Sequence, residues 1–297
     1  MRWNSLALTD VQAALLARVR TEGGFSQQRG EPYRTDATAW AIITLSSIDA
    51  DMTCIQPAMT RLTADQHEDG SISIAPDHPE AFWPTPLAIL AWSCSPVDSE
   101  PRRGAIGFLL RTTGKHWEKR LDEIAQHNTA LKGWPWIAAT HSWIEPTALS
   151  LIALSIAGYQ IHPRVNEGIR MLMDRQLSQG GWNYGNTSVF GQGLRPAPES
   201  TGAALHALAG RVARQDIQRS LDYLSKEVSR LRTPIALGWS LLALNSWGVA
   251  VSNASSLITD CLKRQDRYGP YATTSLCLLA LPLVSPNGLL AKSAGAI

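Results

Sequence analysis

The chain has 297 residues, of which 44% are hydrophobic, so it is long enough to bury one large core. Its formal net charge of +2, without any cluster of lysines and arginines, argues against a nucleic-acid partner. Four widely spaced cysteines without a CxxC pair argue against a disulfide framework and suit a reducing cytosol.

One unit recurs six times along the chain: an amphipathic helix, a loop, and then a helix of small and apolar residues. The first helices mix apolar with charged positions, which is typical of an outer layer. The second helices are apolar nearly all round, which predicts burial on every side. In chain order, the second helices are ATAWAIITL from Ala37, PTPLAILAW from Pro84, PTALSLIAL from Pro146, STGAALHAL from Ser200, ALGWSLLAL from Ala236 and TTSLCLLAL from Thr273.

Threonine stands at the second position of every one of these helices except the fifth, which has leucine. We expect each hydroxyl to accept a hydrogen bond from a free backbone N–H in the first helical turn. A carboxylate lies two positions earlier in three of the copies, where the positive end of the helix dipole favours it. The threonines are Thr38, Thr85, Thr147, Thr201 and Thr274, and the acids are Asp36, Glu145 and Glu199.

The stretch RQLSQGGWNYG ends the first helix of the fourth unit. Gly180 and Gly181 suit the positive φ of a helix C-terminus, and Trp182 can fold back onto the apolar surface. We expect Gln176 to bond to the loose backbone and to the indole edge. Weaker copies, QDRYGPY from Gln265 and QHEDGSI from Gln66, indicate that the phrase is mainly a structural staple.

Six outer helices around six inner ones predict an all-α fold, a closed (α/α)6 barrel or toroid with an apolar hollow. At the observed repeat length, one such toroid uses the whole chain, so we expect a single domain over residues 1–297.

The Q-x-x-x-G-x-W phrase from Gln176 to Trp182, on a repeated helix pair, resembles the QW repeat of squalene–hopene and oxidosqualene cyclases. The same toroid serves as the β-subunit of protein prenyltransferases. The resemblance covers nearly the whole chain and implies a prenyltransferase-like or terpene-cyclase-like toroid. Fold and function are separable, so function has to be argued from the site.

Class II terpene cyclases carry D-x-D-D-T-A at an inner-helix start, and the central acid protonates the substrate. The phrases RTDATA, WIEPTA and APESTG resemble it and keep the central acid as Asp36, Glu145 or Glu199. The flanking acids are missing, and Arg34 and Ala37 take their places in the first copy. A lone carboxyl beside Arg34 favours the ionised form, which is unsuited to protonating an alkene.

Metal chemistry finds no support in the sequence. The zinc ligands of the prenyltransferase β-subunit include a late histidine, and no histidine follows His206. No DDxxD motif is present for a magnesium–diphosphate site. We therefore expect no metal and no cofactor.

The long loops before the inner helices gather aromatic and charged residues at one end of the barrel, where they can form a ligand site. Aromatic faces can stabilise a carbocation. Plainer interpretations stay open: the acids as helix-start residues, His141 as a loop histidine, and the tryptophans as a plug. The candidates for substrate binding are Trp83, Trp136, Trp143, Trp182, Tyr184, Arg34 and Arg195.

The leading hypothesis is a terpene-cyclase-related protein that acts on a hydrophobic isoprenoid or lipid-like substrate. Its reaction would be a metal-free, proton-initiated cyclisation or isomerisation, that of a terpene cyclase or mutase, with Asp36, Glu145, Glu199 and His141 as candidate catalytic residues. One alternative is a non-catalytic toroid that binds an apolar ligand or a protein partner, and another is one subunit of a two-toroid enzyme. The N-terminus lacks a signal-peptide pattern, so we expect a cytoplasmic location, with peripheral membrane contact left open.

Overall fold

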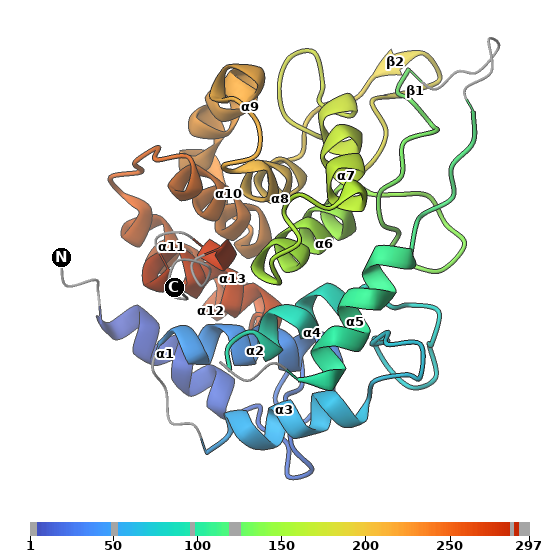
Figure 1. Ribbon diagram of the computed structural model, residues 1–297. Coiled ribbons are helices and arrows are strands. Elements are labelled where there is room, and N and C mark those ends of the chain that lie inside the picture. Colours follow the sequence, from blue (N-terminus) through green and yellow to red (C-terminus); the bar gives the residue numbers. More distant parts are fainter. Residues whose placement is uncertain (1–4, 49–52, 96–98, 119–125, 286–287, 291–297) are drawn as a thin grey trace.

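The computed structural model describes residues 5–48, 53–95, 99–118, 126–285 and 288–290. Most elements in these ranges are helices (Figure 1). The strands β1 (Ser188–Val189) and β2 (Gln192–Gly193) form a short antiparallel hairpin. Among the described residues, no helix has both the length and the apolar character needed to cross a membrane.

In the described ranges, six helices form an inner layer, and nearly all of their apolar residues are buried, as predicted, although Ile235 at the start of α10 is exposed. Every residue of α4 is buried, and so are the first eleven residues of α2. Their bounds are α2 (Thr35–Ser47), α4 (Thr85–Trp92), α6 (Ile144–Ile156), α8 (Pro198–Leu208), α10 (Pro234–Ser246) and α13 (Thr273–Val284).

The amphipathic helices lie outside the inner ones, each with one buried face. The Ser99 hydroxyl caps α5 and the His162 ring caps α7 by accepting from a backbone N–H in the first turn. These outer helices are α1 (Ser5–Leu16), α3 (Ile55–Ala64), α5 (Glu100–Arg111), α7 (Pro163–Asp174), α9 (Arg214–Glu227) and α11 (Ala254–Leu262). The short helices α12 (Gln265–Tyr268), η1 (Val228–Arg230) and η2 (Gly288–Leu290) complete the set.

The inner helices contact one another in chain order: α2 with α4, then α6, α8, α10 and α13. The last of them, α13, contacts α2 again, so the contacts return to their starting helix (Figure 1). We call this set the inner circuit. Outer helices α3, α5, α7, α9 and α11 each pack against the inner helix that precedes them in the chain, while α1 packs against α13, the last inner helix.

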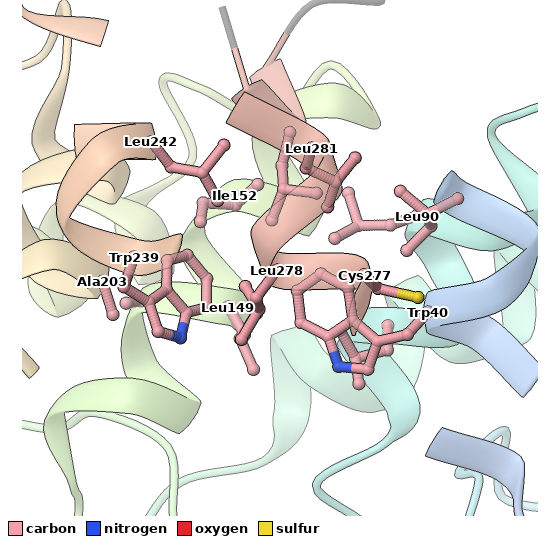
Figure 2. Close-up of a cluster of buried hydrophobic side chains, with 14 of the residues drawn as sticks. Trp40, Leu90, Leu149, Ile152, Ala203, Trp239, Leu242, Cys277, Leu278 and Leu281 are labelled. Atoms are coloured by element: carbon pink, nitrogen blue, oxygen red, sulfur yellow. The ribbon is translucent and has the colours of Figure 1, made fainter. Parts of the chain in front are cut away.

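The interior of the inner circuit is filled with side chains, so the predicted apolar hollow is wrong at this level. Figure 2 shows a cluster of buried apolar residues drawn from all six inner helices. Trp40 of α2 and Trp239 of α10 are 2% and 0% exposed, and their rings meet edge to face with centroids 6.1 Å apart. Two indoles occupy far more volume than the aliphatic residues assumed for a hollow barrel.

The recurring threonine of the repeat has a different role from the predicted one. Thr38 lies one turn inside α2, so its hydroxyl is beyond the free N–H groups of the helix start. It donates to the Arg34 carbonyl (2.7 Å) and accepts from the backbone N–H of Phe25 in the preceding loop (2.9 Å). The same bond joins Thr85 to Ile72, Thr147 to Trp134 and Thr201 to Trp182.

The glycine–aromatic staple is confirmed in part. Gly180 and Gly181 have φ values of 94° and 80°, and Trp182 is fully buried. The Trp182 indole N–H donates to the Leu172 carbonyl (2.7 Å), while the Gln176 amide donates to the Ser220 hydroxyl (2.7 Å). The predicted bond of Gln176 to the indole is therefore wrong, because a backbone carbonyl at the end of α7 already accepts from it.

Candidate functional site

The starts of the inner helices meet at one end of the inner circuit, which we call the mouth. The Thr35 hydroxyl at the start of α2 donates to the Ser73 carbonyl in the loop before α4 (2.7 Å). The Ile144 N–H at the start of α6 donates to the Tyr184 carbonyl in the loop before α8 (2.9 Å). Each loop thus joins the helix that it precedes to a neighbouring one, and this places the three predicted acids at the same end.

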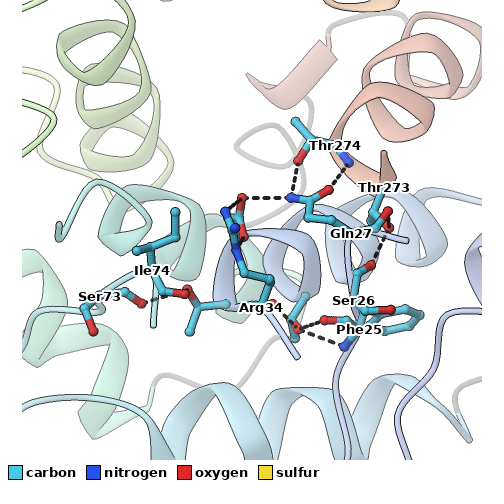
Figure 3. Close-up of polar contacts among 11 residues, drawn as sticks. Phe25, Ser26, Gln27, Arg34, Ser73, Ile74, Thr273 and Thr274 are labelled. Carbon is cyan, nitrogen blue, oxygen red and sulfur yellow. Dashed lines mark hydrogen bonds and ion pairs between the residues drawn. The ribbon is translucent and has the colours of Figure 1, made fainter. Parts of the chain in front are cut away.

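Asp36 is held as an ion-paired carboxylate and is 3% exposed. Arg34 contacts both of its oxygens, with Nε–Oδ1 at 2.9 Å and Nη2–Oδ2 at 3.0 Å (Figure 3). The Gln27 amide donates to Oδ2 (2.8 Å) and to the Thr274 hydroxyl (3.0 Å), which ties α2 to α13. Arg34 and Gln27 thus occupy both carboxyl oxygens, so Asp36 and Arg34 are suited to holding the helices together and not to proton donation.

Glu145 occupies the same place at the start of α6 but has no such cationic partner among the described residues. It keeps some exposed surface, yet burial of its carboxyl raises the pKa to about 7, and the negative charge of Glu199 adds to the rise. The indole N–H of Trp239 opposes this shift, because it favours the ionised carboxylate and so lowers the pKa. Glu145 is therefore a carboxylic acid that is partly neutral near pH 7.

Glu199, at the start of α8, is coupled to Tyr184. The Tyr184 hydroxyl donates to Glu199 Oε1 at 2.6 Å, and its side chain is 52% exposed. This bond to a carboxylate, with burial as a smaller cause, raises the pKa of Tyr184. Since the Tyr184 carbonyl also binds the N–H beside Glu145, Tyr184 bridges the starts of α6 and α8.

The predicted aromatic residues fall into two groups. Trp83 and Trp136 are partly buried at the mouth and pack edge to face, with ring centroids 5.3 Å apart. Trp143 precedes α6 and lies over Gly185, where a Cβ atom would come within 2.9 Å of the indole ring. Trp182 lies outside this group, since it is buried between α7 and the loop that it staples.

His141 and Arg195 lie on exposed loops, and neither side chain forms a hydrogen bond or ion pair with Glu145 or Glu199 among the described residues. The His141 ring packs against Trp117 with centroids 5.2 Å apart. Arg195 lines an open cavity of about 700 Å³ with Arg219, Tyr223 and Lys226. The structure thus brings together Glu145, Glu199, Tyr184 and Trp143 and pairs Asp36 with Arg34, whereas His141 and Arg195 are not bonded to these acids in the described ranges.

Two groups of functional interest were missed by sequence reasoning. One is Trp239 of α10, whose indole lowers the pKa of Glu145; its only signal was an aromatic residue inside an otherwise aliphatic helix. The other is a pair of buried arginines that hold the mouth loops. Arg175 donates to the Ser142 and Gly185 carbonyls (3.0 and 2.7 Å), and burial lowers its pKa to about 10. Arg164 lies 3.6 Å over the Trp134 ring and donates to the Gly133 carbonyl (2.7 Å).

No group of three or more His, Cys, Asp or Glu side chains in the described ranges is arranged to hold a metal ion. The carboxyl groups at the mouth lie beside aromatic rings, and this arrangement is suited to acid–base chemistry.

Solved structures with a similar fold include type II terpene cyclases. No family model matches the sequence, and no curated protein matches it. A variant of the type II terpene cyclase MstE from Scytonema, in complex with its substrate geranylgeranyl dihydroxybenzoate, matches with a TM-score of 0.62 and 14% identity over 96% of both chains. A second variant of that cyclase, in complex with the product merosterolic acid A, matches with a TM-score of 0.61 and 17% identity over 96% of both chains. A crystal structure of a protein from Actinoplanes matches with a TM-score of 0.62 and 14% identity over 94% of this chain and 99% of that one. At these identities the likeness establishes the fold: this chain has the fold of a type II terpene cyclase.

Proposed function

We propose that the chain is a single (α/α)6 toroid that takes a hydrophobic isoprenoid at its mouth and protonates it with Glu145. The closed order of contacts among the inner helices supports the toroid. The proposed substrate class is supported by the two similar cyclase structures, which hold a prenylated substrate and its product. A cytoplasmic location and a single domain over the whole chain stay predictions.

One feature of the mouth carries the activity: burial and the neighbouring charge of Glu199 raise the pKa of Glu145 to about 7. An acid is most effective when its pKa is close to the working pH, because the neutral form is then populated and can still give up its proton. Of the three acids in equivalent places, Asp36 is ion-paired with Arg34 and Glu199 accepts from Tyr184. Glu145 is left as the proton donor.

The proposed reaction is a proton-initiated isomerisation or cyclisation without a metal. The Glu145 proton adds to one carbon of an alkene, the π electron pair forms the new C–H bond, and a carbocation remains. Trp143 and the Trp83–Trp136 pair present aromatic rings at the mouth, where they can stabilise that cation without reacting with it. Loss of a proton from the rearranged cation then gives a neutral product.

The test is product analysis by mass spectrometry in deuterated water. The full chain is incubated with squalene, geranylgeranyl diphosphate or geranylgeranyl dihydroxybenzoate, and protonation on carbon leaves one deuterium in an isomeric product. We expect Glu145→Gln to lower the rate by about 100-fold or more and Glu145→Asp to restore part of it. Glu31→Gln, an exposed carboxyl in the loop before α2, is the control and should keep the wild-type rate. An unchanged rate in Glu145→Gln, or no labelled product from the wild type, would contradict the proposal.

The filled interior favours a second candidate function, a non-catalytic toroid that binds an apolar ligand or a protein at its mouth. Trp40 and Trp239 leave the inner circuit packed at their level, so a long chain has to stay near the surface. Native mass spectrometry of protein purified from its host separates the candidates. A bound lipid that is never converted supports the binder, and a second toroid subunit that co-purifies supports a two-subunit enzyme.

A further inference from the structure

Trp239 closes the interior of the inner circuit on the side of Glu145. It is fully buried, and its ring meets Trp40 across the interior. Its place is fixed by close packing of α8 on α10, because a Cβ atom added at Gly202 would lie 2.6 Å from the Trp239 backbone. A side chain held in this way forms a rigid floor under the mouth.

The indole N–H of Trp239 is buried and has no partner with hydrogen-bonding geometry among the described residues. Other buried or partly buried indoles of the chain do have partners: Trp134, Trp182 and Trp247 donate to backbone carbonyls at 2.7 to 2.9 Å. Burial of an unpaired donor costs free energy, so this exception calls for an explanation. Figure 2 shows the Trp239 nitrogen turned away from Leu242 and Leu281, which lie further along their helices.

The N–H is turned toward the starts of the inner helices. Figure 2 shows Leu149 of α6 beside Trp239, and Glu145 lies one turn before Leu149, at the mouth. The indole favours the charged form of the Glu145 carboxyl, which supports this placement. The other charged group that acts on Glu145 is Glu199, from α8, with Tyr184 bonded to it from the loop. Among the described residues of this site, Trp239 is therefore the donor without an acceptor of its own, since the Tyr184 hydroxyl already donates to Glu199.

We propose that Trp239 is a positioning and specificity residue of the Glu145 site. Its N–H holds the carboxylate that remains after Glu145 has given up its proton, and its ring is the floor that stops a ligand from passing into the interior. The proposal rests on the proposed function, in which Glu145 is the acid.

Both roles of Trp239, holding the Glu145 carboxylate and closing the interior, follow from its position beneath the mouth. A neutral Glu145 gains little from the indole, whereas the carboxylate that forms as the proton moves to carbon accepts its N–H, so the bond strengthens as charge develops. The proton that the rearranged cation loses later returns to the Glu145 carboxylate, which restores the starting state. Since the ring blocks the interior, a ligand reaches Glu145 from the mouth only, and an isoprenoid presents one end or one face of its chain to the acid.

The first test is titration of Glu145 by carbon-13 NMR in the full chain, with Glu145→Gln used to assign its signal. Trp239→Phe keeps a ring but removes the donor, and it should raise the pKa of Glu145 by about one unit. Trp40→Phe is the matched control, because it makes the same change to the other central indole and should leave the pKa in place. A pKa that stays constant or falls in Trp239→Phe would overturn the positioning role.

The second test concerns the floor and uses benzene as the probe. Trp239→Ala should bind benzene in the interior, seen as a shift of the Glu145 signal and of the melting temperature, while the wild type should not respond. If Trp239→Ala does not fold, Trp239→Leu is used in its place. Benzene binding by the wild type with the same shift would show that the floor is open. Neither test needs turnover, so a wild type without isoprenoid activity defeats the proposed function while the titration still decides whether Trp239 acts on Glu145.

Discussion

At the scale of the residue, the neighbours of a carboxyl group decide its chemistry. Asp36, Glu145 and Glu199 share one place in the repeat, and the sequence predicted that they share it. Arg34, two residues before Asp36, also indicated an ion pair with it. The different state of Glu145 could not be predicted, because it arises from burial and from the charge of Glu199, which is distant in sequence and is brought close only by the packing of α6 on α8. Trp239, which opposes the shift, is distant in sequence as well.

His206 is the buried residue whose titration should limit stability in acid. Its ring is 0% exposed in α8, and Nε2 accepts from the Leu289 N–H (3.1 Å), so the proton is on Nδ1, toward the Ser246 hydroxyl. Burial lowers its pKa from 6.5 to about 4. The unfolded chain therefore binds a proton at this site more readily than the folded one between these two pH values.

The free energy of unfolding should thus keep the full His206 contribution above pH 6.5 and lose about 2–3 kcal/mol of it as the pH falls to 4. Urea denaturation of the wild type and His206→Gln between pH 4 and 8 measures this. His206→Gln should be less stable at pH 7 and depend less on pH. His78→Gln replaces an exposed histidine and should keep the wild-type dependence of the unfolding free energy on pH. The same dependence in His206→Gln would refute the assignment.

At the scale of the element, each inner helix from α2 to α8 is locked to the loop before it by one threonine. The repeats in the sequence predicted the recurring threonine and the glycine–aromatic staple, but not the hydrogen bond that joins them. Their pairing could not be predicted, because the bond joins residues 13 to 19 positions apart through loops of unequal length. The buried arginines were missed for a related reason: a charge on an outer helix is normally solvated, and only the folded loops supply the carbonyls that Arg175 satisfies.

Thr201→Val tests the threonine lock. The substitution keeps the shape of the side chain but leaves the buried Trp182 N–H without its acceptor, now at 3.0 Å. We expect a loss of about 1–3 kcal/mol in the free energy of unfolding, measured by chemical denaturation. Thr60→Val, on the exposed face of α3, serves as the control and should change stability by less than about 0.5 kcal/mol. Equal effects of the two substitutions would mean that the lock contributes nothing.

At the scale of the whole molecule, the first loop is bonded to the last inner helix. Arg18 is 5% exposed, and it donates to the Thr273 hydroxyl (3.0 Å) and the Tyr271 carbonyl (2.6 Å). Gln27 adds the bridge from Asp36 to Thr274. The repeat pattern predicted that the two ends of the chain come together, whereas the groups that join them lie in loops that the pattern does not cover.

Arg18→Met should therefore weaken the closure between α2 and α13. It keeps the aliphatic stem but leaves the Tyr271 carbonyl and the Thr273 hydroxyl without this donor, so we expect a loss of about 2–3 kcal/mol. Hydrogen exchange should show faster opening of α1 and α13 than of α6 and α8. Arg20→Met removes a charge from the same loop at a surface pair with Glu22 and should leave both quantities unchanged. Hydrogen exchange that becomes faster by the same factor in all inner helices would argue against a local closure.

The filled interior is the feature of the whole molecule that the sequence predicted least well. An all-round apolar pattern predicts that a helix is buried, and this was confirmed. It does not say which side chains meet across the circuit, and that depends on the rotation of six helices about their axes. Trp40 and Trp239 meet only because these rotations turn both toward the centre.

Titration of the Glu145 carboxyl in the wild type and in Glu199→Gln decides whether Glu145 can be the proton donor. We predict a pKa of about 7 in the wild type and a lower value in Glu199→Gln, because a like charge has been removed. A wild-type pKa near 4.5, the ordinary value for a glutamate, would leave Glu145 ionised at neutral pH and would contradict its role as the proton donor.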